Sequence, residues 1–306
     1  MSEVSVDKKA LIEGERPMYN ASYGKLMMWF FLVSDAFTFS ALLIAYGAIR
    51  VRAVGKGVAW ANPEEVFTHT PILYELFHIE APLVFVGIMT FILILSSVTM
   101  VLAVEAGHRK SRKEVSKWVL YTVIGGFTFL SCQAYEWYHF IIGTHHGAYE
   151  LAPEALSVLG NRTIPDHEVG SSLVVFGLKD AMDVEKIVEL RVASTGYPIS
   201  DPALIELVNN EAHKENSKLV TLTDGGANLK ANEYGPPAFE DLFFFVTGFH
   251  GTHVFSGVVL LLILLINVNK GTYDKRGHYE MTEKIGLYWH FVDLVWVFVF
   301  TFFNLV

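Results

Sequence analysis

The chain has 306 residues, of which 52% are hydrophobic, and its mean hydropathy of +0.37 is high for a soluble protein of this length. The formal net charge of −9 arises mainly in residues 143–238, which hold 14 acidic and 7 basic side chains. No nucleic-acid-binding motif, phosphate-binding loop or nucleophile elbow is present, and the single cysteine, Cys132, excludes an intrachain disulfide and a C-x-x-C metal motif.

Five apolar runs are long enough to cross a bilayer, which takes about 20 residues. They are Leu26–Tyr46, Pro82–Val104, Trp118–Ile142, Leu242–Val268 and Ile285–Val306. The first run is too long for a signal-peptide core and is followed by no A-x-A cleavage site, so we expect it to be retained as a helix. The pattern predicts an all-α integral membrane protein, a five-helix bundle interrupted by an outer-side insertion of mixed structure.

Four parts are expected along the chain: a cytoplasmic tail (1–25), helices one to three (26–142), an extramembrane insertion (143–238), and helices four and five (239–306). Basic residues are concentrated in the tail and in the turns 105–117 and 269–284. Cytoplasmic loops carry the excess of lysine and arginine in membrane proteins. The N-terminus is therefore predicted inside and the C-terminus outside.

The insertion has the composition of a small soluble unit. We predict a short strand at Ser172–Phe176 and amphipathic helices at Asp180–Val192 and Pro202–Lys218. Asp201 is the expected N-cap of the second helix, with Pro202 at its first position. A unit of about 95 residues has a thin core, so we expect it to rest on the bundle or on a partner protein.

Ionisable side chains lie within four of the five predicted spans. Asp35 falls ten residues into the first run, roughly 15 Å from its end and close to the bilayer midplane. The others form pairs spaced i, i+3: Glu136 with His139, His250 with His253, and His290 with Asp293. A solitary carboxylate in lipid costs several kcal/mol. Acid–histidine pairing across helices is therefore expected.

Three interpretations of this polar set are open. The residues can be structural partners that fix helix register, or at least one of them, Asp35 first, can hold or relay a proton. Metal or haem ligation is disfavoured, because two histidines three residues apart are weak support without surrounding ligand motifs. We predict no metal site. The ridge of small residues Gly248, Thr252 and Ser256 indicates close helix packing at the same place.

Four clustered cations mark the turn between the second and third helices: Arg109, Lys110, Arg112 and Lys113. Clustered positive charge next to a bilayer attracts anionic lipid phosphate. The turn is therefore a candidate lipid site. The alternative is a turn that only sets topology.

Two segments resemble the signatures of the last two helices of cytochrome c oxidase subunit III. They are Thr247-Gly248-Phe249-His250-Gly251-Thr252-His253-Val254 and Tyr288-Trp289-His290-Phe291-Val292-Asp293-Leu294-Val295-Trp296. Gln133-Ala134-Tyr135-Glu136-Trp137 is similar to a third motif of the family, and Leu95-Ser96-Ser97-Val98-Thr99 is similar more loosely. The resemblance extends over all five predicted helices.

The resemblance implies a core subunit of a haem–copper terminal oxidase that carries no haem or copper itself. Those centres belong to the partner subunits I and II. Subunit III binds beside subunit I, holds phospholipid, and is thought to support proton uptake in the bacterial inner membrane. It implies that His250 and His253 are not metal ligands. Asp35, Glu136, His250, His253, His290 and Asp293 would then form the intramembrane polar set.

This chain departs from the family pattern in three places. Ser34-Asp35 stands where the family has serine followed by glutamate, which shortens the reach of the carboxyl. The chain resembles the five-helix form rather than longer members. The 143–238 insertion matches nothing in the family pattern and is predicted to contact subunit II, a cytochrome c or another respiratory complex.

Three other functions are compatible with parts of the sequence. A quinol oxidase can have the same type of subunit III, because the electron donor is chosen by subunit II. A subunit III-like protein of a nitric oxide reductase is a further candidate. A stand-alone proton-coupled transporter using Asp35 and Glu136 is disfavoured, because the sequence lacks inverted repeats and broken helices.

Overall fold

The structure is a computed structural model, and it describes residues 22–55, 60, 82–142, 148–157, 164, 172–179, 186–192, 197–212, 214, 217–223, 226–227 and 237–305. The predicted cytoplasmic tail lies outside the described residues up to position 21. So does most of the loop between the first two helices.

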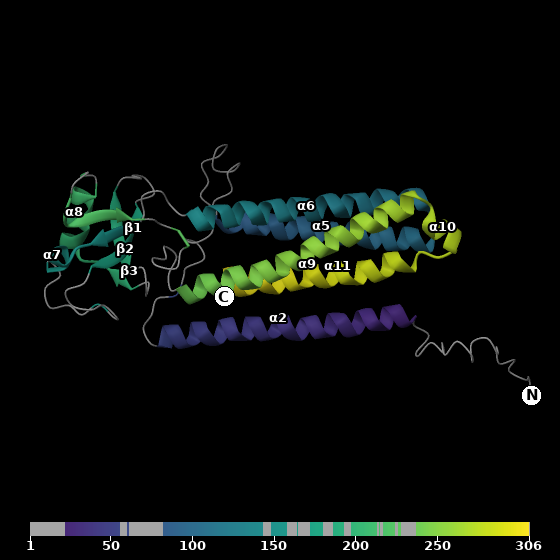
Figure 1. Cartoon of the computed structure of the whole chain (residues 1–306), viewed down its shortest axis with the longest axis horizontal. Coiled ribbons are helices and arrows are strands. Elements are labelled where there is room, and N and C mark those ends of the chain that lie inside the picture. The colour runs from purple at the N-terminus through teal and green to yellow at the C-terminus, as the bar shows by residue number, and fades with distance from the viewer. Residues whose placement is uncertain are drawn as a thin grey trace, which may run out of the picture.

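Five long helices dominate the described part, and all five are long and apolar enough to cross a membrane. They are α2 (Tyr23–Gly55), α5 (Pro82–His108), α6 (Arg112–Ile142), α9 (Pro237–Asn269) and α11 (Glu280–Phe300), followed by the π-helical turn η3 (Thr301–Leu305). They run side by side along the long axis of the molecule (Figure 1). The predicted five-helix membrane bundle is thus confirmed. Several helices extend beyond the apolar runs because polar residues continue the same hydrogen-bonded spiral.

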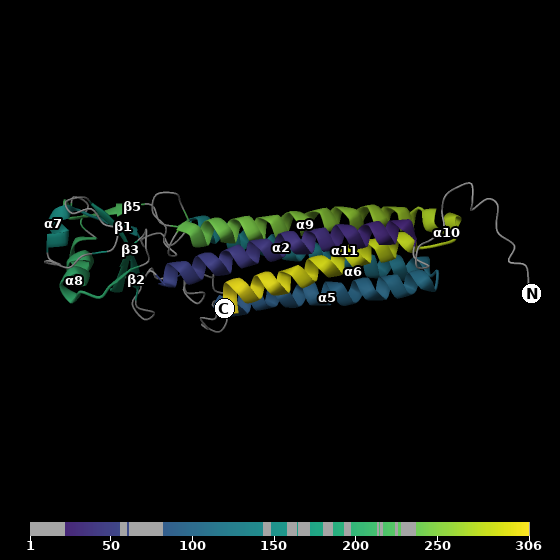
Figure 2. The same cartoon turned by 90° about the horizontal axis from the view of Figure 1, so that it is seen from below.

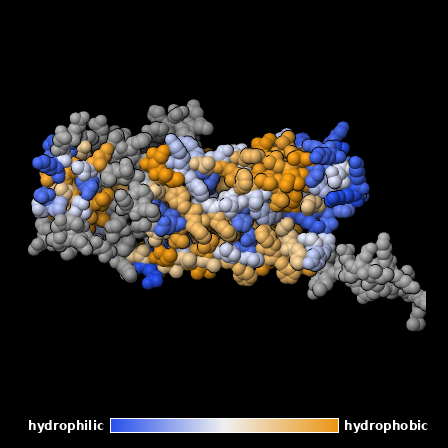
Figure 3. All heavy atoms as spheres, in the orientation of Figure 1, coloured by the Kyte–Doolittle hydropathy of each residue, from blue (hydrophilic) through white to orange (hydrophobic). Residues whose placement is uncertain are grey.

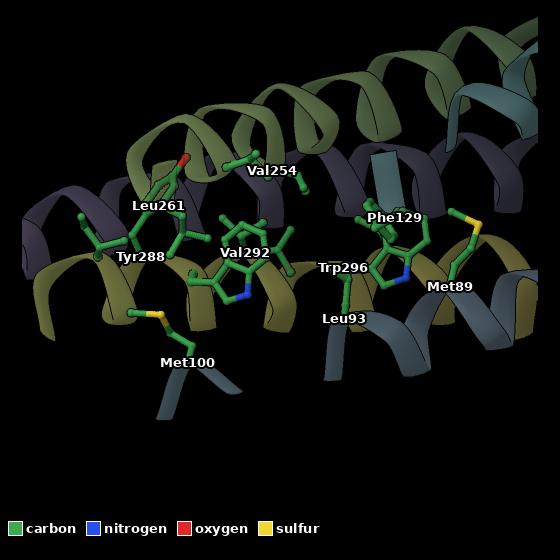
Figure 4. Packing of buried hydrophobic residues seen from close by; sticks show 14 of the residues in the cluster. Met89, Leu93, Met100, Phe129, Val254, Leu261, Tyr288, Val292 and Trp296 are labelled. Atoms are coloured by element: carbon green, nitrogen blue, oxygen red, sulfur yellow. The ribbon is translucent and has the colours of Figure 1, made fainter. Parts of the chain in front are cut away.

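Helix α11 lies centrally and packs against α2, α5 and α9, while α6 packs against α5 and α9. Trp289 of α11 is fully buried and connects four helices. Its ring lies against Gly126 of α6 and Gly257 of α9, and its Nε1–H donates to Ser96 Oγ of α5 at 3.0 Å. Two turns of helix further on, Trp296 packs edge-to-face on Phe129, with ring centroids 4.7 Å apart (Figure 4). Close approach at small residues is typical of membrane helix packing.

Both basic turns lie at one end of the bundle, together with the start of α2 (Figures 1 and 2). The short helix α10 (Thr272–Arg276) joins α9 to α11 between Gly271 and Gly277, whose positive φ angles of 70° and 79° favour glycine. The Tyr279 hydroxyl donates to Asp274 in this connection. Burial, with Asp274 as a second cause, raises the pKa of Tyr279 to about 12. The hydroxyl therefore stays protonated and keeps the turn closed at ordinary pH.

The insertion forms a five-stranded antiparallel sheet at the opposite end of the bundle (Figure 1). The strand order is β4-β3-β2-β1-β5, with β1 at Ala148–Leu151, β2 at Leu173–Lys179, β3 at Ile187–Val192, β4 at Pro198–Ile199 and β5 at Val220–Thr223. Helices α7 (Pro153–Leu156) and α8 (Pro202–Glu211) complete it. Leu204 and Val208 of α8 belong to the same buried cluster as the inward residues of β1, β2 and β3. This unit has a core of its own.

The predicted helix at Asp180–Val192 is wrong where the structure describes it, because Ile187–Val192 is strand β3. A bulge at Leu178/Lys179 shifts the register, so that Ile187, Leu190 and Val192 all face the core. The spacing of three residues between Ile187 and Leu190 is the spacing expected on one face of a helix, which explains the wrong prediction. The predicted helix from Pro202 is present but ends at Glu211. Asp201 is its N-cap, as predicted, and accepts a hydrogen bond from the Ala203 amide at 3.0 Å.

Asn209 of α8 covers the edge of β3 beyond the end of the two-residue strand β4. Its side-chain amide donates to the Ile187 carbonyl and accepts from the Ile187 amide, both at 2.8 Å. An unpaired strand edge is open to pairing with other chains. The asparagine therefore substitutes for a missing strand neighbour.

Replacing Asn209 with alanine is expected to destabilise the extramembrane unit by about 1–3 kcal/mol, because two half-buried backbone groups lose their partner. Hydrogen exchange of the full chain in detergent should show faster exchange of the Ile187 amide. Asn210→Ala, at the exposed neighbouring position of the same helix, is the matched control. Equal protection of the Ile187 amide in the two variants would contradict this assignment.

Candidate functional site

Asp35 of α2 and His253 of α9 meet inside the bundle. His253 Nε2 lies 2.9 Å from Asp35 Oδ2, and the two side chains are only 13% and 14% exposed. The distance is that of an ion pair. The angles are not those of a hydrogen bond, and Oδ2 accepts none from the described residues. The other ring nitrogen, Nδ1, lies 2.8 Å from the Phe249 carbonyl one turn earlier on α9. The ring of Phe39 from α2 packs on His253 beside the pair.

These contacts limit where the pair can hold protons. A carbonyl can only accept, so Nδ1 bears a hydrogen. One further proton at Nε2 or Oδ2 would give either imidazolium with carboxylate or imidazole with carboxylic acid. Both forms are neutral overall. Loss of the proton would leave a net negative charge inside the membrane, which is costly.

Glu136 is buried on the face of α6 whose residues Phe129 and Phe140 contact α9. The residue is 2% exposed, and Oε2 accepts a hydrogen bond from Gln133 Nε2 at 3.1 Å, one turn away on the same helix. Within the described residues, Oε1 has no hydrogen-bond partner. The neighbouring Trp137 ring packs on Gly248 of α9. Glu136 therefore pairs with an amide instead of the expected histidine.

His250 is fully buried among aromatic rings from three other helices. Phe39 of α2, Phe129 of α6 and Trp296 of α11 surround it, and the Trp296 ring is nearest at 5.1 Å between centroids. Neither of its ring nitrogens has a hydrogen-bond partner in the part of the chain that the structure describes. His250 and His253 share a helix and a contact with Phe39, but they do not share a polar partner among the described residues.

His290 and Asp293 of α11 face α5. The Ser97 hydroxyl of α5 lies 2.5 Å from His290 Nδ1. Asp293 is 7% exposed and close to the same serine, although neither carboxylate oxygen has a hydrogen bond of regular geometry among the described residues. The two residues therefore gather around a serine that the sequence analysis assigned no role.

The structure contains one acid–histidine pair across helices, Asp35 with His253, whereas Glu136 contacts Gln133, and His290 and Asp293 lie around Ser97. The polar set is distributed over the α2–α9, α6–α9 and α5–α11 interfaces. Gln133, Ser97 and Tyr288 were missed as partners; Tyr288 OH lies 2.7 Å from Ser256 Oγ and donates to the His253 carbonyl at 3.1 Å. All three lie within the segments that resemble family motifs, and this position was the one sign in the sequence that they could be functional. The described residues contain no cluster of three or more histidine, cysteine or acidic side chains suited to a metal.

Comparison with known proteins agrees with this architecture. The family model described as cytochrome c oxidase subunit III matches residues 233–305, which contain α9 and α11. The quinol oxidase subunit 3 of Bacillus spizizenii is 26% identical over 290 residues, covering 92% of this chain and 88% of that protein.

Shorter matches are closer in sequence. The cytochrome c oxidase subunit 3 of Rattus norvegicus is 28% identical over 148 residues, or 45% of this chain and 56% of the relative. The probable cytochrome c oxidase subunit 3 of Rickettsia conorii is 38% identical over 82 residues. This match covers 24% of this chain and 29% of the relative. The matched segments thus span little more than half of the rat subunit and under a third of the Rickettsia subunit.

Five long apolar helices, packed on an apolar core that contains a few buried polar side chains, define a multi-pass membrane protein. The family match and the relatives show what the chain is similar to: subunit III of cytochrome c oxidases and of quinol oxidases.

Proposed function

We propose that this chain is the non-redox subunit III of a proton-pumping haem–copper terminal oxidase, in which it stabilises subunit I and supports proton uptake. Haem and copper would reside in subunits I and II. The Asp35–His253 pair supports the proposal, because a carboxyl group and an imidazole that face each other at 2.9 Å can hold one proton inside the membrane without a net charge. Such a pair can hold a proton but has no means of transferring electrons.

The proposed orientation places the N-terminus inside and the insertion outside, in a bacterial inner membrane. It is supported by the common end of the two basic turns and the start of α2, opposite the sheet (Figure 1). The acidic insertion would then lie on the electron-donor side, where subunit II, a cytochrome c or another respiratory complex can contact it.

Cytochrome c is the first candidate for the electron donor of the complex. Quinol is the second candidate, and one observation favours it: the relative that covers 92% of this chain is a quinol oxidase subunit. Oxygen consumption by the purified complex, with reduced cytochrome c and with a quinol in parallel, separates the two.

Affinity purification of the tagged full chain from its membrane is expected to yield a complex that contains haem and a copper-binding subunit. Optical spectra and metal analysis provide the measurement. A tagged Asp35→Asn variant controls for assembly, since it keeps the side-chain shape and should recover the same haem content. Recovery of the chain alone, free of haem, would refute the oxidase and favour the transporter.

A further inference from the structure

Tyr288 of α11 lies beside the Asp35–His253 pair without being a member of it. The residue is 4% exposed. Its hydroxyl donates to the His253 carbonyl at 3.1 Å and lies 2.7 Å from Ser256 Oγ, which is itself 2.9 Å from the same carbonyl. The Asp35 carboxyl group is near enough to interact with Tyr288 electrostatically. Tyr288 therefore connects α11 to the backbone of the histidine that faces Asp35.

The position of the α9 backbone decides where the His253 ring lies. Because Nδ1 is bound to the Phe249 carbonyl on the same helix, the imidazole moves with α9. A shift of about 0.5 Å already matters for a functional contact of this kind. The face of the bundle shown in Figure 3 is mostly apolar between its hydrophilic end and the sheet. A weakened contact between His253 and Asp35 would therefore not be replaced by bonds to water from that surface.

The Tyr288 ring contacts both helices that carry the pair. On α2, the Phe31 ring lies one turn before Asp35, and its centroid is 6.1 Å from that of Tyr288. On α9, a Cβ atom at Gly257 would lie 3.3 Å from Tyr288 Cε1, so the helix backbone approaches the ring closely. The side chain points from α11 toward α9 (Figure 4). Its size therefore helps to set the distance between α2 and α9.

We propose that Tyr288 is a positioning residue for the Asp35–His253 pair. Its ring spaces α2 from α9, and its hydroxyl holds the α9 backbone at His253. The role rests on the proposed function, in which the pair holds a proton. Tyr288 takes no proton itself, and it acts through the distance of 2.9 Å between His253 Nε2 and Asp35 Oδ2.

The test is a Tyr288→Phe variant of the intact oxidase complex, because phenylalanine keeps the ring and removes only the hydroxyl. Turnover limited by proton uptake is expected to fall about fivefold, which is the order of one lost hydrogen bond. Haem content should equal that of the parent. The matched control is Tyr46→Phe. Tyr46 is a buried tyrosine of α2 that accepts a hydrogen bond from Trp60 Nε1 at 3.2 Å, and its variant should turn over like the parent.

A spectroscopic signature separates positioning from packing. The infrared carboxyl bands of Asp35 are assigned by their loss in Asp35→Asn, and they respond to the contact with His253. These bands should be displaced in Tyr288→Phe and unchanged in Tyr46→Phe. Adding Tyr288→Phe to Asp35→Ala should slow turnover no further, because no pair is then left to position.

Unchanged Asp35 bands in Tyr288→Phe would overturn the positioning role, and so would additive losses in the double variant. If Tyr288→Phe does not assemble, Ser256→Ala provides the test, since it removes the serine that contacts the Tyr288 hydroxyl. Displaced Asp35 bands are expected there, and unchanged bands would overturn the role. Parent-like turnover of Asp35→Ala would instead refute the proton-holding function, while the infrared bands would still decide whether Tyr288 positions the pair.

Discussion

An Asp35→Ala variant is expected to assemble with normal haem spectra but to turn over about tenfold more slowly when proton uptake limits the rate, a change of about 1.4 kcal/mol in the barrier. Alanine leaves His253 Nε2 without the carboxylate 2.9 Å away, so the shared proton has no second holder. The measurement is oxygen consumption and its decline over successive turnovers, in proteoliposomes that contain the whole complex.

Conservative variants separate proton holding from packing. Asp35→Glu restores a carboxyl and should recover most of the rate, whereas Asp35→Asn keeps the shape without an exchangeable acid proton and should behave like alanine. His253→Ala combined with Asp35→Ala should cost little more than either change alone, because the two side chains act as a pair. Parent-like turnover of Asp35→Asn would show a structural role. Loss of the haem spectrum would make Asp35 an assembly residue.

A Gly126→Val variant is expected to lose most of its folded yield, since the position has no room for a side chain. A Cβ atom there would lie 2.6 Å from Val258 Cγ2 and 2.7 Å from Trp289 Cη2. Overpacking of this kind costs typically 1–3 kcal/mol and more where neighbours cannot move. Trp289 is held by its bond to Ser96 and by Gly257 on its other side. Size-exclusion profiles and thermal unfolding in detergent provide the measurement.

Gly87→Val is the matched control, because a Cβ at this transmembrane glycine of α5 meets nothing within 4 Å. A second change tests the cause. Trp289→Phe removes the ring atoms nearest to Gly126 and should restore part of the yield when combined with Gly126→Val. If the control is equally damaged, the effect comes from valine in a membrane helix and not from the contact with Trp289.

The membrane helices were predictable from sequence because the bilayer imposes a minimum apolar length and leaves few alternatives to a helix. The insertion was less predictable. Its strands pair across long separations, for example Ala148 with Thr223, and sequence periodicity reports nothing of such pairing. The bulge at Leu178/Lys179 also displaced Ile187 from the alternation that identifies a strand.

The buried polar residues could be recognised in the sequence because ionisable side chains are costly inside a membrane. Their partners could not be recognised in this way. Spacing on one helix shows which side chains share a face and not which helix covers that face. His250 and His253 lie three residues apart, yet one is enclosed by aromatic rings and the other faces Asp35. The pairing of Glu136 with Gln133 was missed because both lie on the same helix, while the expectation concerned partners on different helices.

The central position of α11 has a consequence for biosynthesis. This helix begins at residue 280, after the other four, and it provides contacts to α2, α5 and α9. While the chain is still being made, the four earlier helices are in the bilayer without the element that fills the space between them. Resistance of the nascent protein to membrane proteases should therefore appear abruptly and late, when Trp289 enters, instead of growing with each inserted helix.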